Sequence, residues 1–205
     1  MQTLGLSDST PRSEGRLKTL LWPTIRNATD LEDVTGQGFW VCWAIGGITL
    51  GFSLVAGGVQ IVVGVFQALF FCLGGIGVRQ RSRFAAVVLF VSYLADYLIL
   101  LSMAGPYFSN QLFFNGSSGG VLRIFILALL LANVRGTWLA ARWPQSEAEA
   151  TIPRLSATLW DKLSDQMPRV VWPRVRYFFY LLAGLELLLL LLALVGVIAS
   201  RIKAS

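Results

Sequence analysis

The sequence predicts an all-α fold, a polytopic transmembrane bundle of five helices, and three observations lead to this prediction. Of the 205 residues, 55% are hydrophobic and only 14% are charged, whereas a soluble domain carries roughly 25% charged residues. The apolar residues gather in blocks of about 20, the length that a helix needs to cross a hydrocarbon layer about 30 Å thick. Tryptophans and arginines collect at the ends of these blocks, as they do at membrane surfaces.

Residues 1–38 are polar and mixed in charge, and we expect them to form a cytoplasmic or interfacial arm. The segment lacks the early apolar core and small-residue cleavage site of a signal peptide. Trp22, followed by Pro23 and Arg26, resembles the later order Trp172, Pro173 and Arg176. Both sets of residues are typical of interfacial anchors, with tryptophan at the headgroups and arginine facing anionic lipid.

Residues 39–78 contain no charge and are long enough for two helices, so a hairpin is predicted. The first span covers 39–56, the second covers 59–78, and Gly57 and Gly58 form the turn. Several small residues are expected to let the helix backbones approach closely, and these are Gly46, Gly47, Gly51, Gly64, Gly74, Gly75 and Gly77.

Arg79, Arg81 and Arg83 separate the second span from a third over 84–105. Pro106 ends that span because a proline ring cannot continue a helix. An uncharged loop leads to the fourth span at 121–141, which completes a four-span membrane core over 39–142.

Residues 143–176 form a polar insertion, expected to be cytoplasmic and interfacial, before the fifth span at 177–200 and a short tail to 205. Near 155–167, Leu155, Leu159 and Leu163 share one helical face. We expect an amphipathic helix lying on the membrane surface. Two alternatives stay open: the apolar stripe packs on the ends of the spans, or it docks a partner protein.

The arginine distribution predicts an orientation, since short cytoplasmic loops are enriched in arginine and lysine. With five spans, the three arginines of the second loop and the basic insertion share one side, and the uncharged loops share the other. The N-terminus is therefore expected inside and the C-terminus outside, in an inner (cytoplasmic) cell membrane. The interfacial anchors facing anionic lipid at the inner face would be Trp22, Trp143, Trp160, Trp172, Arg79, Arg81 and Arg83.

Within residues 37–142 the chain resembles a group of small, uncharacterised bacterial polytopic membrane proteins with a four-span core. Three motifs carry the resemblance: Gln37-Gly38-Phe39-Trp40, the segment Gly77-Val78-Arg79-Gln80-Arg81-Ser82-Arg83-Phe84-Ala85-Ala86-Val87, and Asn133-Val134-Arg135-Gly136-Thr137-Trp138. The resemblance implies a compact bundle with a basic inner turn and implies no activity. The chain departs from the pattern at Gln67, where similar proteins place an acid, and in lacking a histidine after the third motif.

Ionisable residues inside spans are costly and are default candidates for function. Asp96, Arg135 and Glu186 are such residues, and Asn133 lies close to Arg135 in sequence. We expect Arg135 to pair with Asp96 or Glu186 in a charge network. Two alternatives remain: Arg135 reaches the headgroups while the acids are protonated or bound to Asn133, Tyr93 or Tyr97, or the acids form a proton or ion path.

The absence of histidine excludes histidine-ligated haem or zinc, so no cofactor is predicted. No nucleophile and base occur at a recognisable spacing, and no nucleic-acid partner is expected. The leading hypothesis is a non-enzymatic accessory or structural subunit that packs beside other membrane subunits. The alternative is a small transporter or channel using Asp96 and Glu186. Enzymes acting on lipids and pigment-binding subunits are less well supported by these residues.

Overall fold

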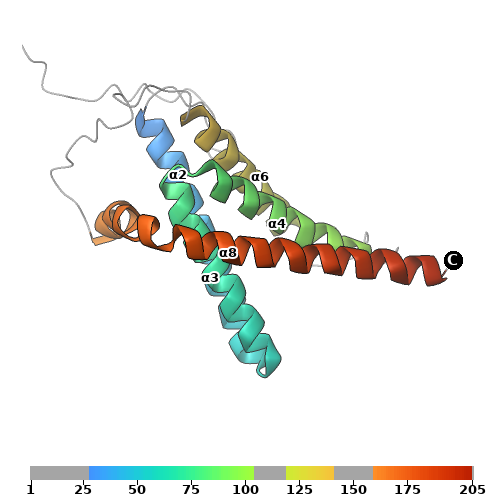
Figure 1. Cartoon of the computed structure of the whole chain (residues 1–205). Helices are drawn as coiled ribbons and strands as arrows, with labels where there is room; N and C mark the ends of the chain where they lie inside the picture. Colours follow the sequence, from blue (N-terminus) through green and yellow to red (C-terminus); the bar gives the residue numbers. More distant parts are fainter. Residues whose placement is uncertain (1–27, 104–118, 141–158, 205) are drawn as a thin grey trace, which may run out of the picture.

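The computed structural model describes residues 28–103, 119–140 and 159–204 (Figure 1). Every element in these ranges is a helix. They are α2 (Ala28–Ala56), α3 (Val59–Arg79), α4 (Arg83–Met103), α6 (Gly119–Ala140) and α8 (Leu159–Ala204).

All five helices are long and apolar enough to cross a membrane, and the mean hydropathy of their most apolar stretches lies between 1.6 and 2.8. Helices satisfy their own backbone hydrogen bonds, which a lipid environment requires. The prediction of an all-α, five-span, multi-pass membrane protein is confirmed.

The first helix begins earlier than the sequence predicts. Residues 28–38, expected in the polar arm, form the first turns of α2. Leu31 and Val34 are buried in the bundle, and the Thr35 hydroxyl donates to the Leu31 carbonyl at 3.0 Å. Burial of these side chains outweighs the local polarity that suggested an arm. Residues 1–27, with Trp22, lie outside the described part.

The insertion and the fifth span are also joined differently. α8 is a single helix of 46 residues with Pro168 and Pro173 inside it, so the predicted 155–167 helix continues into the 177–200 span. Proline removes a backbone donor and bends a helix, and Figure 1 shows a bend near the start of α8. Trp143 and residues 155–158 lie outside the described part, as does the side chain of Trp160.

The hairpin turn forms where it is predicted. Gly57 and Gly58 have φ angles of 74° and 59°, a left-handed conformation that glycine adopts without strain. Across the hairpin, a Cβ added at Gly64 would lie 1.9 Å from Ser53 Oγ, and one added at Gly75 would lie 2.9 Å from Cys42 Cβ. The expectation of close backbone approach is confirmed there, but the space beside Gly47 and Gly51 is open.

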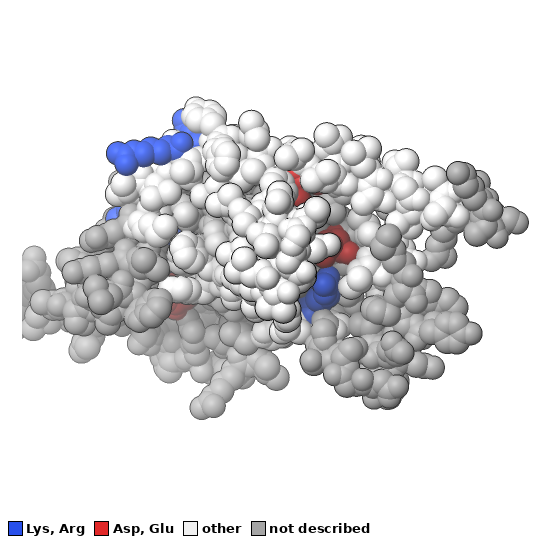
Figure 2. All heavy atoms as spheres, turned by 90° about the horizontal axis from the view of Figure 1, so that it is seen from below, with Lys and Arg blue, Asp and Glu red and all other residues white. Residues whose placement is uncertain are grey.

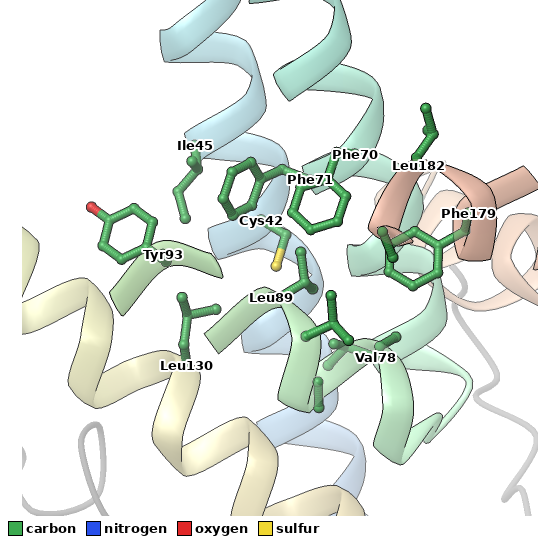
Figure 3. Close-up of a cluster of buried hydrophobic side chains, with 14 residues drawn as sticks. Cys42, Ile45, Phe70, Phe71, Val78, Leu89, Tyr93, Leu130, Phe179 and Leu182 are labelled. Carbon is green, nitrogen blue, oxygen red and sulfur yellow. The ribbon is translucent and has the colours of Figure 1, made fainter. Parts of the chain in front are cut away.

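The core lies at the crossing of the helices, around the second half of α3 (Figure 3). Phe70 of α3 stacks on Phe179 of α8, with ring centroids 5.7 Å apart. Phe71 meets Tyr93 of α4 edge to face at 6.2 Å, and Leu130 of α6 is buried in the same cluster. Side chains from all five helices therefore meet in this one cluster.

Away from this core the helices diverge. In Figure 1 the Gly57 end of the α2–α3 hairpin and the C-terminal end of α8 point in different directions. Half of the most apolar stretch of α3 is buried in the bundle, whereas only 17% of the corresponding stretch of α8 is buried. Exposed side chains such as Phe52, Val55, Leu191 and Leu192 cover the diverging parts, which is the surface expected to face lipid or other membrane helices.

Candidate functional site

The first polar contact inside the membrane spans joins α3 to α8. Gln67 Nε2 donates to both carboxylate oxygens of Glu186, at 2.9 and 3.0 Å. Gln67 lies about 12 Å from one end of α3 and about 18 Å from the other, at 1.5 Å per residue. Glu186 is only 4% exposed. Gln67 therefore forms an interhelical hydrogen bond with a buried acid as its partner.

The second polar contact joins α4 to α6. Arg123 Nη1 lies 3.1 Å from Asp96 Oδ2 in an ion pair, and the two side chains are 34% and 60% exposed. Asp96 lies about 10 Å from the Met103 end of α4, and Arg123 about 6 Å from the start of α6, at 1.5 Å per residue. The pair therefore lies within the length of the spans and is open on one side.

The contacts of the two acids differ from the predicted charge network. The Asp96 carboxylate pairs with Arg123 and the Glu186 carboxylate with Gln67, whereas the sequence suggested that Arg135 pairs with Asp96 or Glu186. Arg135 lies twelve residues beyond Arg123, about 18 Å farther along α6. Antiparallel counting from the Arg83 end of α4 places Asp96 within about one turn of Arg123, so the register could have identified this partner.

Asn133 also differs from its predicted role. It is 2% exposed, and its amide nitrogen donates to the Leu129 carbonyl of its own helix at 2.8 Å. Its side chain lies against Gly38 of α2, where an added Cβ would come within 2.2 Å of Asn133 Oδ1. Asn133 therefore packs α6 onto α2 at this point.

Opposite the hairpin tip, the α3–α4 turn is held by a defined set of hydrogen bonds. Ser82 N donates to the Gly77 carbonyl and Arg81 N to the Val78 carbonyl, both at 2.9 Å. This pattern is a Schellman motif, and Arg81 takes its left-handed position with φ 58°. Ser82 Oγ then accepts from Ala85 N at 3.3 Å, which caps the first turn of α4.

Arg79 connects the same turn to α2. Its Nη1 donates to the Glu32 carbonyl and to Thr35 Oγ1, the latter at 3.1 Å. The guanidinium lies against Gly36, where an added Cβ would be 3.2 Å away. Arg79 therefore holds the start of α2 against the end of α3, and its role as an interfacial anchor stays a prediction.

Aromatic side chains accompany the arginines at this end of the bundle. Trp172 of α8 packs on Gly77, where an added Cβ would lie 2.5 Å from its ring. The Arg83 guanidinium lies 5.6 Å from the Trp138 ring centroid, within the range of a cation–π contact. Trp138 is 49% exposed. Tryptophan and arginine thus occur together where three spans end, as the sequence suggests.

Arg81 lies in an electropositive setting. It is half-buried, and burial is the main cause that lowers the pKa of its guanidinium. Glu32 opposes this shift, whereas the positive charges of Arg79 and Arg169 lower the pKa further. An anion close to this turn would be favoured by the same charges.

The described residues contain no group of three acidic, cysteine or histidine side chains that could hold a metal ion. Neither family models, curated proteins nor solved structures match this chain. The site is therefore defined by its own geometry: a buried acid–amide contact, an open ion pair, and a basic turn at the end of the spans.

Proposed function

We propose that this chain is a non-enzymatic accessory or structural subunit of a larger assembly in a bacterial inner membrane. The proposal rests on the Asp96–Arg123 ion pair, whose side chains are 60% and 34% exposed inside the spans. Arg123 Nη1 and Asp96 Oδ2 form the contact between the charged groups, at 3.1 Å. The other carboxylate and guanidinium atoms retain hydrogen-bonding capacity.

Charged groups at span depth cost at least a few kcal/mol when they face hydrocarbon. A polar side chain from a neighbouring membrane helix would remove that cost by hydrogen bonding to the open side of the pair. Figure 2 shows acidic and basic side chains adjoining on a face whose other described residues are almost all uncharged. Such a face suits a partner that brings few polar groups in matching positions.

The orientation proposed for the subunit places the N-terminus inside and the C-terminus outside. Trp172 packs on Gly77, so the basic start of α8 lies at the same end as the α3–α4 turn. Arg79, Arg81 and Arg169 therefore share one end of the bundle, and the positive-inside rule assigns this end to the cytoplasm. The hairpin turn at Gly57 would face the other side.

Co-purification tests the subunit proposal. The chain is extracted from its own membrane in mild detergent, and the mass of the complex that it forms is measured by native mass spectrometry. We expect a second membrane chain in stoichiometric amount, lost in an Asp96→Leu/Arg123→Leu variant. The control is Asp33→Leu/Arg174→Leu, which removes the same two charges at exposed positions. Recovery of the wild type only as a lone monomer, or equal retention by both variants, would contradict the proposal.

One observation favours a small transporter or channel as the second candidate. Glu186 is a buried carboxyl near the middle of the apolar stretch of α8, and α8 packs against the Asp96 helix α4. Buried acids at this depth are typical of proton and ion paths. Proton and cation flux would be measured in liposomes with wild type and with an Asp96→Asn/Glu186→Gln variant. Unchanged flux in the variant would remove this candidate.

A further inference from the structure

The α3–α4 turn gathers guanidinium groups from two parts of the chain. Arg79 and Arg81 come from the turn itself, and Arg169 comes from the start of α8. Pro168, next to Arg169, is fully buried, so this part of α8 packs against the bundle. Among the described residues, Glu32 is the acid that acts on Arg81. Two further positive charges, those of Arg79 and Arg169, therefore act on Arg81 together with the carboxylate of Glu32.

We propose that Arg81 and Arg169 form a binding site for the phosphate group of an anionic phospholipid, and that Arg79 adds a further positive charge to this site. This inference is independent of the Asp96–Arg123 face and of the partner proposed there. Guanidinium groups bind phosphate oxygens through paired, charge-assisted hydrogen bonds. Basic pockets between membrane helices bind lipid headgroups in the same way.

The conformation of Arg81 supports a role beyond closing the turn. Its φ of 58° is in the left-handed region, which is unfavourable for residues other than glycine. The Schellman motif needs only the backbone of this residue, and glycine would close it without strain. The arginine therefore contributes a side chain that the turn itself does not require.

The position of the turn matches the position of a headgroup. α3 ends at Arg79 and α4 begins at Arg83, so the turn lies where two spans leave the hydrocarbon. Trp172, half-buried beside Gly77, lies at the same level, and tryptophan rings favour the headgroup region. The acyl chains of a lipid bound here would lie along the apolar faces of the spans.

Electrostatics distinguishes this site from the other arginines of α8. Arg81 is half-buried beside two further positive charges, and these lower its pKa together with burial. A bound phosphate would offset both causes. Arg169 and Arg174 are both exposed on α8, but Arg169 is among the charges that act on Arg81 and Arg174 is not. Arg174 therefore provides a matched control for the loss of one positive charge.

The experiment uses the full chain in a neutral detergent, titrated with dioleoyl phosphatidylglycerol. Native mass spectrometry gives the occupancy of tightly bound lipid, and the rise in Tm gives stabilisation. Arg81→Gly and Arg169→Gln are compared with Arg174→Gln. Dioleoyl phosphatidylcholine and inorganic phosphate are titrated in parallel, because phosphate chemistry alone does not distinguish a lipid from a free ion.

We expect phosphatidylglycerol to bind the wild type and Arg174→Gln equally, and to bind Arg81→Gly and Arg169→Gln roughly tenfold more weakly, since each loses charge-assisted bonds. Without lipid, Arg81→Gly should have a Tm no lower than that of the wild type, because glycine suits the left-handed turn; this shows that the variant is folded. Equal weakening in Arg174→Gln would overturn the proposal. Equal stabilisation by phosphatidylcholine or by inorganic phosphate would also overturn it.

Discussion

Gly38 and Asn133 meet where α2 contacts α6, and single atoms decide the packing there. The amide group of Asn133 lies so close to Gly38 that an added Cβ would approach its oxygen to 2.2 Å. Asn133 Oδ1 is buried without a hydrogen-bond partner among the described residues. The position therefore has no room for a side chain on α2.

A Gly38→Ala substitution is expected to destabilise the protein by about 1–3 kcal/mol, the usual cost of overfilling a packed interior. Thermal unfolding in detergent would measure the loss. Gly47→Ala is the control, because an added Cβ at Gly47 meets nothing within 4 Å. Adding Asn133→Ala to Gly38→Ala should restore part of the stability. Equal stability of the two alanine variants would contradict the expectation.

The Gln67–Glu186 contact allows a second prediction at the scale of residues. Gln67→Leu removes the amide donor from a buried carboxylate and should cost about 1–3 kcal/mol. The exposed Gln60 on the same helix provides the control, and Gln60→Leu should change stability by less than about 0.5 kcal/mol.

A double-mutant cycle with Glu186→Leu isolates the pair itself. The interaction energy between Gln67 and Glu186 is expected to be about 0.5–3 kcal/mol, as for residues in direct contact. Additive losses in the double variant would show that the two side chains contribute separately, against the hydrogen bonds seen between α3 and α8.

At the scale of elements, the ends of α3 and α4 depend on side chains that can be recognised in sequence. Ser82 precedes the first residue of α4 and accepts from Ala85 N, which is the usual role of a serine before a helix. Ser82→Ala should therefore cost about 0.5–2 kcal/mol. The control is Ser200→Ala, since Ser200 is exposed and, within the described residues, bonds to the Val197 carbonyl of its own helix. A Ser82→Ala variant as stable as this control would contradict the capping role.

The sequence predicts the five helices well because their apolar blocks match the width of a membrane. The residues at which the helices begin and end are harder to predict. Residues 28–38 contain acidic and polar side chains, yet Leu31 and Val34 are buried by packing on other helices. Similarly, Pro168 and Pro173 suggest a break, but α8 continues through both. Tertiary packing decided each of these cases, and one helix considered alone does not reveal it.

The candidate site was predicted less completely than the fold. Composition alone points to Asp96 and Glu186, because acids inside spans are rare. Their partners Arg123 and Gln67 depend on which helices adjoin and in what register, and Arg123 was missed because it lies near the start of its span. A count of residues from the basic ends would have suggested Arg123. The contact between Gln67 and Glu186, 119 positions apart, requires the structure.

At the scale of the whole molecule, the proposed orientation gives a topology that labelling can test. In a Cys42→Ser/Cys72→Ser background, Val59→Cys places one thiol at the exposed start of α3, and Gln80→Cys places another at its opposite end. An impermeant thiol reagent added to intact cells should label the first and leave the second unmodified until the cells are opened. The reverse pattern would contradict an inside N-terminus.

Trp172 lies at the headgroup level, and the part of α8 from Pro173 to Ser200 rises about 42 Å as a straight helix. A hydrocarbon layer of about 30 Å cannot enclose it upright. Beyond Glu186 no described residue of α8 is buried. The C-terminal part of α8 is therefore attached to the bundle only through the residues that precede it. We expect this C-terminal part to tilt relative to the membrane normal, and the tilt to increase as the bilayer becomes thinner. We therefore expect the end of the last helix to tilt differently in bilayers of different thickness, while the core around Phe179 keeps its packing.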